Sequence, residues 1–207
     1  MLRSDPLKQR FPRRRFVLYV EGPSDCEILR TWARLVSPAL ARAVDDCTVI
    51  LGGRRPARAL AHFEEVSANA DVEPRALCVL DRDGSAAPPS AAPDPPGFEF
   101  YTWPRRHIES YLLVPEAIRG SMRSSRDVRI DRLLLDVLPD EAAIRNFDAK
   151  RLLTPNGVLS RALGASVHPA AVARYMNRSD LHEDVLLLLE RLCRAVGLEV
   201  GTPGEGR

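Results

Sequence analysis

Short apolar runs alternate with amphipathic segments along the first half of the chain. The run FVLYV at 16–20 contains no alternating polar positions, which is typical of a parallel strand covered on both faces. Further strands are predicted at 47–51, 75–80 and 98–103, and helices at 56–69 and 107–118. Because strands that alternate with helices form right-handed βαβ units, the pattern predicts a Rossmann-like α/β fold with a mostly parallel sheet of about four strands.

A further helix is predicted directly after the 16–20 strand. Ser24 fits the N-cap position and Glu27 lies three residues later, which is the pattern of a capping box. Apolar residues then continue at helical spacing, and Pro38 lies just beyond the expected end of this helix.

The second half of the chain is expected to be helical. Helical patterns recur over residues 130–138, 140–147, 157–163, 168–176 and 184–196. We therefore divide the chain into a basic N-terminal extension (1–15), an α/β core (16–115), a helical C-terminal subdomain (116–200) and a flexible tail (201–207). A Pro/Ala-rich loop at 85–97 interrupts the core between its third and fourth strands.

The composition of the 207 residues is that of an ordinary globular protein, with 45% hydrophobic and 28% charged residues. A net charge of +2 is too small to indicate nucleic-acid binding by itself, although arginines cluster at 13–15, 54–55 and 105–106. The apolar runs are too short to span a membrane, and the N-terminus lacks the apolar core of a secretory signal. We therefore expect a cytoplasmic protein without a membrane partner.

Acidic residues follow three of the predicted strands. They are Glu21 and Asp25 after the first strand, Asp81 and Asp83 after the third, and Glu109 after the fourth. Because ligands gather at the carboxyl ends of the strands in open parallel sheets, we expect these acids to lie close together. Clustered carboxylates imply a compensating cation, and Mg²⁺, or Mn²⁺ in its place, prefers such oxygen ligands. Taken singly, each acid could equally serve a turn or a helix N-terminus.

The motifs YVEGPSD at 19–25 and LCVLDRDG at 77–84 resemble the TOPRIM domain of topoisomerases, bacterial primases and several nucleases. RRHIESYLL at 105–113 further resembles the OLD (overcoming lysogenization defect) branch, in which an additional Glu follows the Asp-x-Asp motif. The resemblance covers roughly residues 16–195. It implies a metal-dependent phosphodiester nuclease, whose matching metal-site positions are Glu21, Asp25, Asp81, Asp83 and Glu109.

OLD-like enzymes also place a lysine downstream, and FDAKRLL at 147–153 supplies Lys150. Lys8 and Lys150 are the only lysines of the chain, whose other basic residues are all arginines. Because an ammonium is a compact point charge, a retained Lys150 suggests a catalytic role in balancing charge on the phosphate. A solvated lysine at a helix end is the alternative.

Four arginines are candidates for holding a nucleic-acid backbone. Arg54 and Arg55 follow two glycines between a strand and a helix, and Arg105 and Arg106 lie beside Glu109.

These features favour a nuclease subunit of a bacterial antiviral defence system that cleaves DNA or RNA. The sequence contains no P-loop, whereas OLD-type TOPRIM domains are often fused to an ABC-type ATPase, so the resemblance implies a separately encoded ATPase partner. The alternative is a non-catalytic TOPRIM interaction module with a structural or regulatory metal site. A primase-like or topoisomerase-like role ranks lowest because the chain lacks room for additional DNA-handling domains. Homo-oligomerisation is left open.

Overall fold

The computed structural model describes residues 16–82, 94–122, 128–140 and 143–199. Its sheet has 4 strands, all parallel, in the order β2-β1-β3-β4. The strands are β1 (Phe16–Val20), β2 (Thr48–Ile50), β3 (Arg75–Leu80) and β4 (Phe98–Thr102). The expected α/β fold with a parallel sheet is therefore confirmed. The 1–15 extension, Asp83, most of the 85–97 loop and the 201–207 tail lie outside the described residues.

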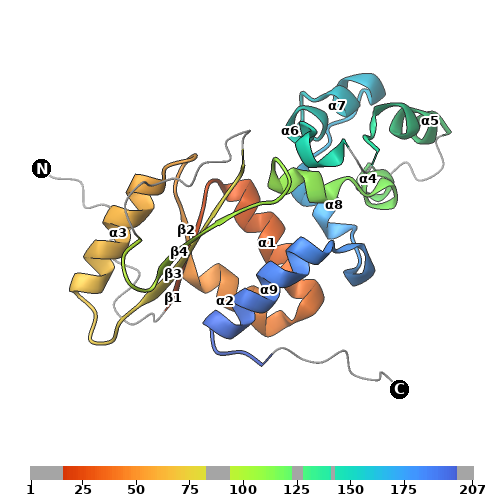
Figure 1. The fold of residues 1–207 in the computed structure, drawn as a ribbon. Coiled ribbons are helices and arrows are strands. Elements are labelled where there is room, and N and C mark those ends of the chain that lie inside the picture. The colour runs from red at the N-terminus through yellow and green to blue at the C-terminus, as the bar shows by residue number, and fades with distance from the viewer. Residues whose placement is uncertain (1–15, 83–93, 123–127, 141–142, 200–207) are drawn as a thin grey trace, which may run out of the picture.

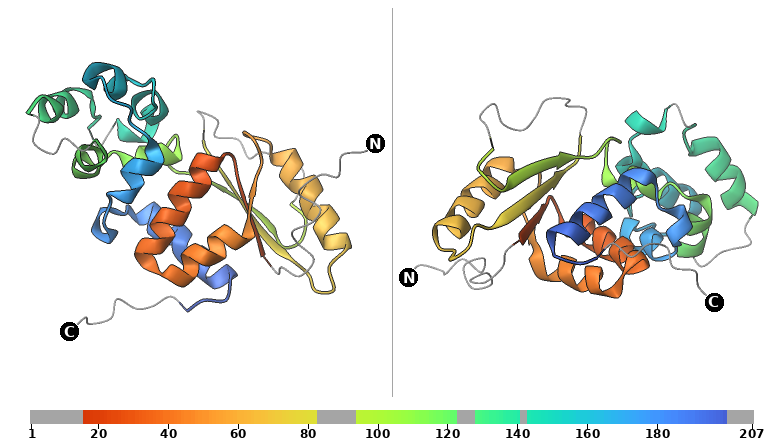
Figure 2. Two further views of the ribbon diagram at one scale, coloured as in Figure 1. Left: turned by 180° about the vertical axis from the view of Figure 1, so that it is seen from behind. Right: turned by 60° about the horizontal axis from the view of Figure 1, so that its bottom comes forward.

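Different helices cover the two faces of the sheet (Figures 1 and 2). Because side chains alternate along a strand, Val17 and Tyr19 of β1 pack with Phe63 of helix α3 (Pro56–Ala68). Leu18 and Val20 belong to the opposite cluster, which includes residues of helices α1 (Pro23–Val36), α2 (Pro38–Cys47) and α9 (Glu183–Ala195). Burial on both faces explains why the strands are continuous apolar runs.

The chain after β4 is helical, as expected for most of this region. Its elements are η2 (Ile108–Leu112), α4 (Pro115–Ser121), α5 (Val128–Val137), η3 (Ile144–Asn146), α6 (Ala149–Leu152), α7 (Val158–Leu163), α8 (Pro169–Arg174), η4 (Arg178–Asp180) and α9. Helix α8 packs against α1 and η2, and one buried apolar cluster extends from Leu18 in the sheet to Leu159 in α7. None of the helices in the described part of the chain is long and apolar enough to cross a membrane.

Helix α1 begins differently from its expected start. Its N-cap is Gly22 rather than Ser24, and Pro23 takes the first helical position, where a missing N–H costs no helical hydrogen bond. Asp25, not Glu27, is the third helical residue, and its Oδ2 accepts a hydrogen bond from the Gly22 N–H at 2.8 Å. The N-terminus of α1 is thus capped by a carboxylate that was assigned to the candidate metal site.

The expected end of the first helix is confirmed, because α1 ends at Val36, just before Pro38. Pro38 itself begins helix α2, with Ser37 as the N-cap, and the sequence pattern did not predict this second helix. Cys47 ends α2, so β2 starts at Thr48.

The segments 107–118 and 140–147 form less helix than expected. Residues 107–118 divide into the 3₁₀ turn η2 and the start of α4, because Pro115 begins a new helix at its own first position. In the described part of 140–147, only the short 3₁₀ turn η3 forms.

Gly97 lies directly before β4 and bonds to the start of β3. Its carbonyl accepts a hydrogen bond from Ala76 N at 2.7 Å, and its φ of 79° lies in the left-handed region that favours glycine. A Cβ at this position would lie 2.7 Å from the Pro74 carbonyl oxygen, which is backbone and cannot move aside easily.

We therefore expect Gly97→Ala to lower the free energy of unfolding by about 2 kcal/mol or more, because backbone strain and a steric clash add together. Gly164→Ala is the matched control, since Gly164 also has a positive φ of 62° but, its chain neighbours aside, no described residue places an atom within 4 Å of an added Cβ. The control should lose only about 1 kcal/mol. Urea unfolding of both variants measures the difference, and equal losses would contradict the clash.

Candidate functional site

The carboxyl ends of β1 and β3 are joined by hydrogen bonds. Glu21 follows β1, and its Oε1 accepts a hydrogen bond from the backbone N–H of Asp81 at 2.8 Å. Asp81 follows β3 and is buried, with 3% of its surface exposed. Because β1 and β3 are parallel neighbours, their ends meet at one edge of the sheet. The two acids are thus neighbours although 60 positions separate them in the sequence.

Both side-chain oxygens of Asp81 accept hydrogen bonds from later parts of the chain. The backbone N–H of Ile108, at the start of η2, donates to Oδ1 at 2.9 Å. The ammonium of Lys150, on α6, donates to Oδ2 at 2.5 Å. Arg54 donates to the Asp81 carbonyl oxygen, and its Nη1 lies 3.8 Å from Glu21 Oε1. Asp81 therefore connects the ends of two strands, the turn η2 and helix α6.

Glu109 and Asp25 complete the group of acids around Lys150. Burial raises the pKa of the Glu109 carboxyl to about 7, with Lys150 opposing this shift and the charges of Asp81 and Asp25 adding to it. Burial also raises the pKa of Asp25 to about 6, and the charge of Asp81 adds to that shift. Repulsion by the charge of Asp81 thus adds to burial in raising the pKa values of Glu109 and Asp25.

Lys150 is the cation that offsets this repulsion. Burial lowers the pKa of its ammonium, but the attraction of Asp81, with contributions from Glu109 and Asp25, outweighs burial and raises the pKa above its ordinary value. We call Glu21, Asp25, Asp81, Glu109 and Lys150 the acid cluster.

The acid cluster fits a divalent cation in chemistry but not in its present arrangement. Carboxylate oxygens are the ligands that Mg²⁺ prefers, and Glu109 Oε2 is buried with no hydrogen-bond partner within the described residues. Within the same residues, however, no three acidic, histidine or cysteine side chains are placed so that they could hold a metal ion. Asp83, the remaining predicted ligand, lies outside the described residues. A metal role for these acids therefore stays a prediction.

The four candidate phosphate-binding arginines are in different environments. Arg54 donates a hydrogen bond to the Asp81 carbonyl within the site, whereas Arg55 is exposed at the N-cap of α3. Arg105 is used inside the fold, because its Nη1 donates to the Ser110 carbonyl at 2.8 Å and its guanidinium lies 4.7 Å from the centre of the Tyr111 ring. Arg106 lies 3.8 Å from the Asp148 carboxylate. Their nucleic-acid role stays a prediction.

Arg82 is a site residue that sequence reasoning missed. Its Nη2 donates to the Arg145 carbonyl at 2.8 Å and to Asn146 Oδ1 at 2.6 Å. The Arg106 N–H donates to the same carbonyl at 3.0 Å. These bonds anchor the segment that precedes Lys150. The sequence held no signal for them, because 63 positions separate Arg82 from Arg145.

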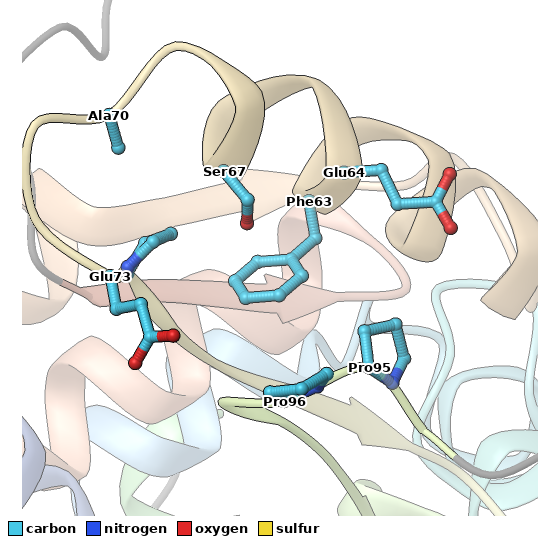
Figure 3. Close-up of a pocket in the computed structure, with 8 residues that line it drawn as sticks. Phe63, Glu64, Ser67, Ala70, Glu73, Pro95 and Pro96 are labelled. Carbon is cyan, nitrogen blue, oxygen red and sulfur yellow. The ribbon is translucent and has the colours of Figure 1, made fainter.

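A separate cavity of about 400 Å³ lies at the opposite edge of the sheet, where β3 and β4 begin (Figure 3). It is lined by Phe63, Glu64, Ser67, Ala70, Glu73, Pro74, Pro95 and Pro96. In Figure 3 the carboxylates of Glu64 and Glu73 lie on either side of the Phe63 ring, so they do not converge on a common point. The acid cluster is therefore the candidate functional site.

Known structures share this fold. The C-terminal region of the Burkholderia pseudomallei OLD protein superposes with a TM-score of 0.53 and 16% identity, over 88% of this chain and 98% of that one. The C-terminal region of the Xanthomonas campestris pv. campestris OLD protein gives 0.52 and 16%, over 89% and 96%. No protein-family model matches the sequence, and no curated protein matches it significantly. At the level of fold, the resemblance to OLD proteins is confirmed.

The raised pKa of Glu109 has a consequence for stability. Its ordinary value is 4.5 and its value in the fold is about 7, so the folded state binds more protons than the unfolded state between these limits. Stability is therefore expected to fall as pH rises through this window, by at most about 3 kcal/mol from this group.

Glu109→Gln should remove that part of the pH dependence and stabilise the protein at about pH 8, because a neutral amide needs no proton. Chemical denaturation between about pH 5 and pH 8 measures it. Glu64→Gln, at an exposed glutamate of α3, is the control and should retain the wild-type slope. If the unfolding free energy of Glu109→Gln changed with pH as steeply as that of wild type, this would contradict a raised pKa of Glu109.

Proposed function

We propose that this chain is a nuclease subunit that hydrolyses phosphodiester bonds of DNA or RNA with Mg²⁺ or Mn²⁺. The observation that carries the proposal is the acid cluster, in which buried carboxylates from separate segments surround one ammonium group. The fold shared with the C-terminal regions of OLD proteins supports it. The motifs around Glu21, Asp81 and Glu109 resemble the OLD nucleases and support it independently of the fold.

The proposed roles follow from the chemistry of each side chain. Glu21, Asp25, Asp81, Asp83 and Glu109 would bind the divalent ion, whose general contribution is to polarise the phosphate and activate water. Glu109, with a pKa of about 7, can take up or release a proton near neutral pH. Arg54 holds Glu21 and the Asp81 backbone in place, and Arg55, exposed beside it, would contact the phosphate backbone.

The proposal extends to an ATPase partner. An ABC-type ATPase would control this nuclease in a cytoplasmic antiviral system, because the motifs resemble those of OLD-type TOPRIM domains, which are often fused to such an ATPase. Copurification from the native host tests this part, and recovery of the chain without an ATPase would oppose it.

One observation favours the alternative of a non-catalytic interaction module. The charge of Asp81 is already compensated by Lys150, and the described acids are not arranged as a metal site. Such a module would have an intact acid cluster but no cleavage activity, so the assay below separates the two functions.

We expect Glu21→Gln and Asp81→Asn each to lower metal-dependent cleavage at least about 100-fold, because each removes a charge that the transition state requires. The assay uses duplex DNA, single strands and structured RNA, with and without Mg²⁺ or Mn²⁺. Asp136→Asn, at an exposed acid of α5, is the control and should cleave like wild type.

Full cleavage activity in both Glu21→Gln and Asp81→Asn would contradict the proposal that the acid cluster is the nuclease active site. Absence of cleavage by the wild-type protein on every substrate, alone and with its ATPase partner, would favour the non-catalytic alternative.

A further inference from the structure

Lys150 occupies one of the two side-chain oxygens of Asp81, and oxygens of this kind are the ligands that Mg²⁺ prefers. The ammonium lies 2.5 Å from Asp81 Oδ2, while Ile108 N–H holds Oδ1. Asp81 therefore offers both side-chain oxygens to donors of the protein itself. The Lys150 side chain is 38% exposed, whereas that of Asp81 is 3% exposed, so the lysine side chain borders solvent while the carboxylate it contacts is buried.

The fold holds Lys150 at this position through its backbone. Asp148 caps α6 by accepting a hydrogen bond from the Arg151 N–H at 3.0 Å, and Ala149 and Leu152 on either side of Lys150 are buried. The preceding residues are anchored by the bonds of Arg82 to Arg145 and Asn146. The backbone on both sides of Lys150 is thus held by burial and hydrogen bonds, while its side chain is partly exposed.

A divalent ion and the Lys150 ammonium would compete for Asp81 Oδ2. A divalent ion bound to Asp81 Oδ2 would lie within a few ångströms of the ammonium, and like charges at that separation repel strongly in a partly buried site. Glu109 Oε2, buried and without a partner in the described part of the chain, shows that the cluster retains an acceptor that Lys150 does not satisfy. Lys150 thus occupies Asp81 and Arg54 lies beside Glu21, while Glu109 retains a buried oxygen that neither cation satisfies.

We propose that Lys150 is the resident cation of the acid cluster and that a divalent metal ion binds by displacing its ammonium from Asp81. The inference rests on the proposed function, because that function supplies the metal. Metal binding then releases the ammonium toward solvent, where an anionic phosphate can reach it. The lysine thereby becomes available to the substrate only in the metal-bound protein.

The lysine content of the chain permits a direct test. Lys8 and Lys150 are the only lysines, so protein made with isotope-labelled lysine has two side-chain NMR signals, and Lys8→Arg identifies the one from Lys150. Titration with Mg²⁺ should shift the Lys150 signal along the same saturation curve as metal binding measured by calorimetry. The Lys8 signal should not follow that curve.

Metal affinity gives a second readout. Lys150→Met removes the competing charge and should bind Mn²⁺ about tenfold more tightly than wild type in calorimetry. Arg151→Met changes the net charge equally at the next, exposed residue and should stay within about twofold of wild type. Circular dichroism checks the fold of each variant, and the lysine NMR experiment decides the matter in wild type if Lys150→Met does not fold.

The outcomes separate the two proposals. Metal binding that leaves the Lys150 signal unchanged, or equal affinities of folded Lys150→Met and wild type, would overturn the displacement while leaving the proposed function standing. Absence of metal binding in wild type and in both variants would overturn the metal-dependent function together with this inference.

Discussion

The arrangement of the site depends on the bonding of one buried carboxylate, Asp81. Its backbone N–H donates to Glu21, its carbonyl accepts from Arg54, and its side-chain oxygens accept from Ile108 N–H and Lys150. A charge buried to this degree is tolerated only when it is paired and hydrogen-bonded. The need to satisfy Asp81 therefore brings together segments from the sheet, the turn after β4 and helix α6.

Lys150 compensates only part of the negative charge around Asp81. Lys150 offsets one carboxylate, while burial, with the charge of Asp81 adding to it, raises the pKa values of Glu109 and Asp25 to about 7 and about 6. A site of this kind is ready to exchange protons or to accept further positive charge near neutral pH. The combined ability of these side chains to exchange protons and bind a cation connects the fold to the proposed phosphodiester chemistry.

The sequence predicted the parts of the structure that depend on local pattern and on strand direction. Each strand core was recognisable as an apolar run, and parallel strands place the residues after β1 and β3 at one edge, where Glu21 and Asp81 now lie. The start of α1 was wrong because two acids could serve the cap, and in the structure it is Asp25, not Glu27, that accepts the hydrogen bond from the Gly22 N–H.

Contacts between distant segments were beyond the reach of the sequence. Nothing in the spacing indicates that Arg82 bonds to Arg145, 63 positions later, and so anchors the segment before Lys150. Even between Arg105 and Tyr111, which are only 6 positions apart, the sequence did not indicate that the guanidinium lies over the ring. A family resemblance singled out Lys150, but its contact with Asp81 spans 69 positions and required the structure. Residue types were therefore readable from the sequence, whereas their pairing was not.

The most direct measurement is anomalous diffraction from crystals of the full chain soaked with Mn²⁺, compared with unsoaked crystals. The account predicts an anomalous peak within coordinating distance of Asp81 and Glu109, with the Lys150 ammonium turned away from Asp81 in the soaked crystal only. An intact Lys150–Asp81 contact in both crystals, with no peak among these acids, would contradict it.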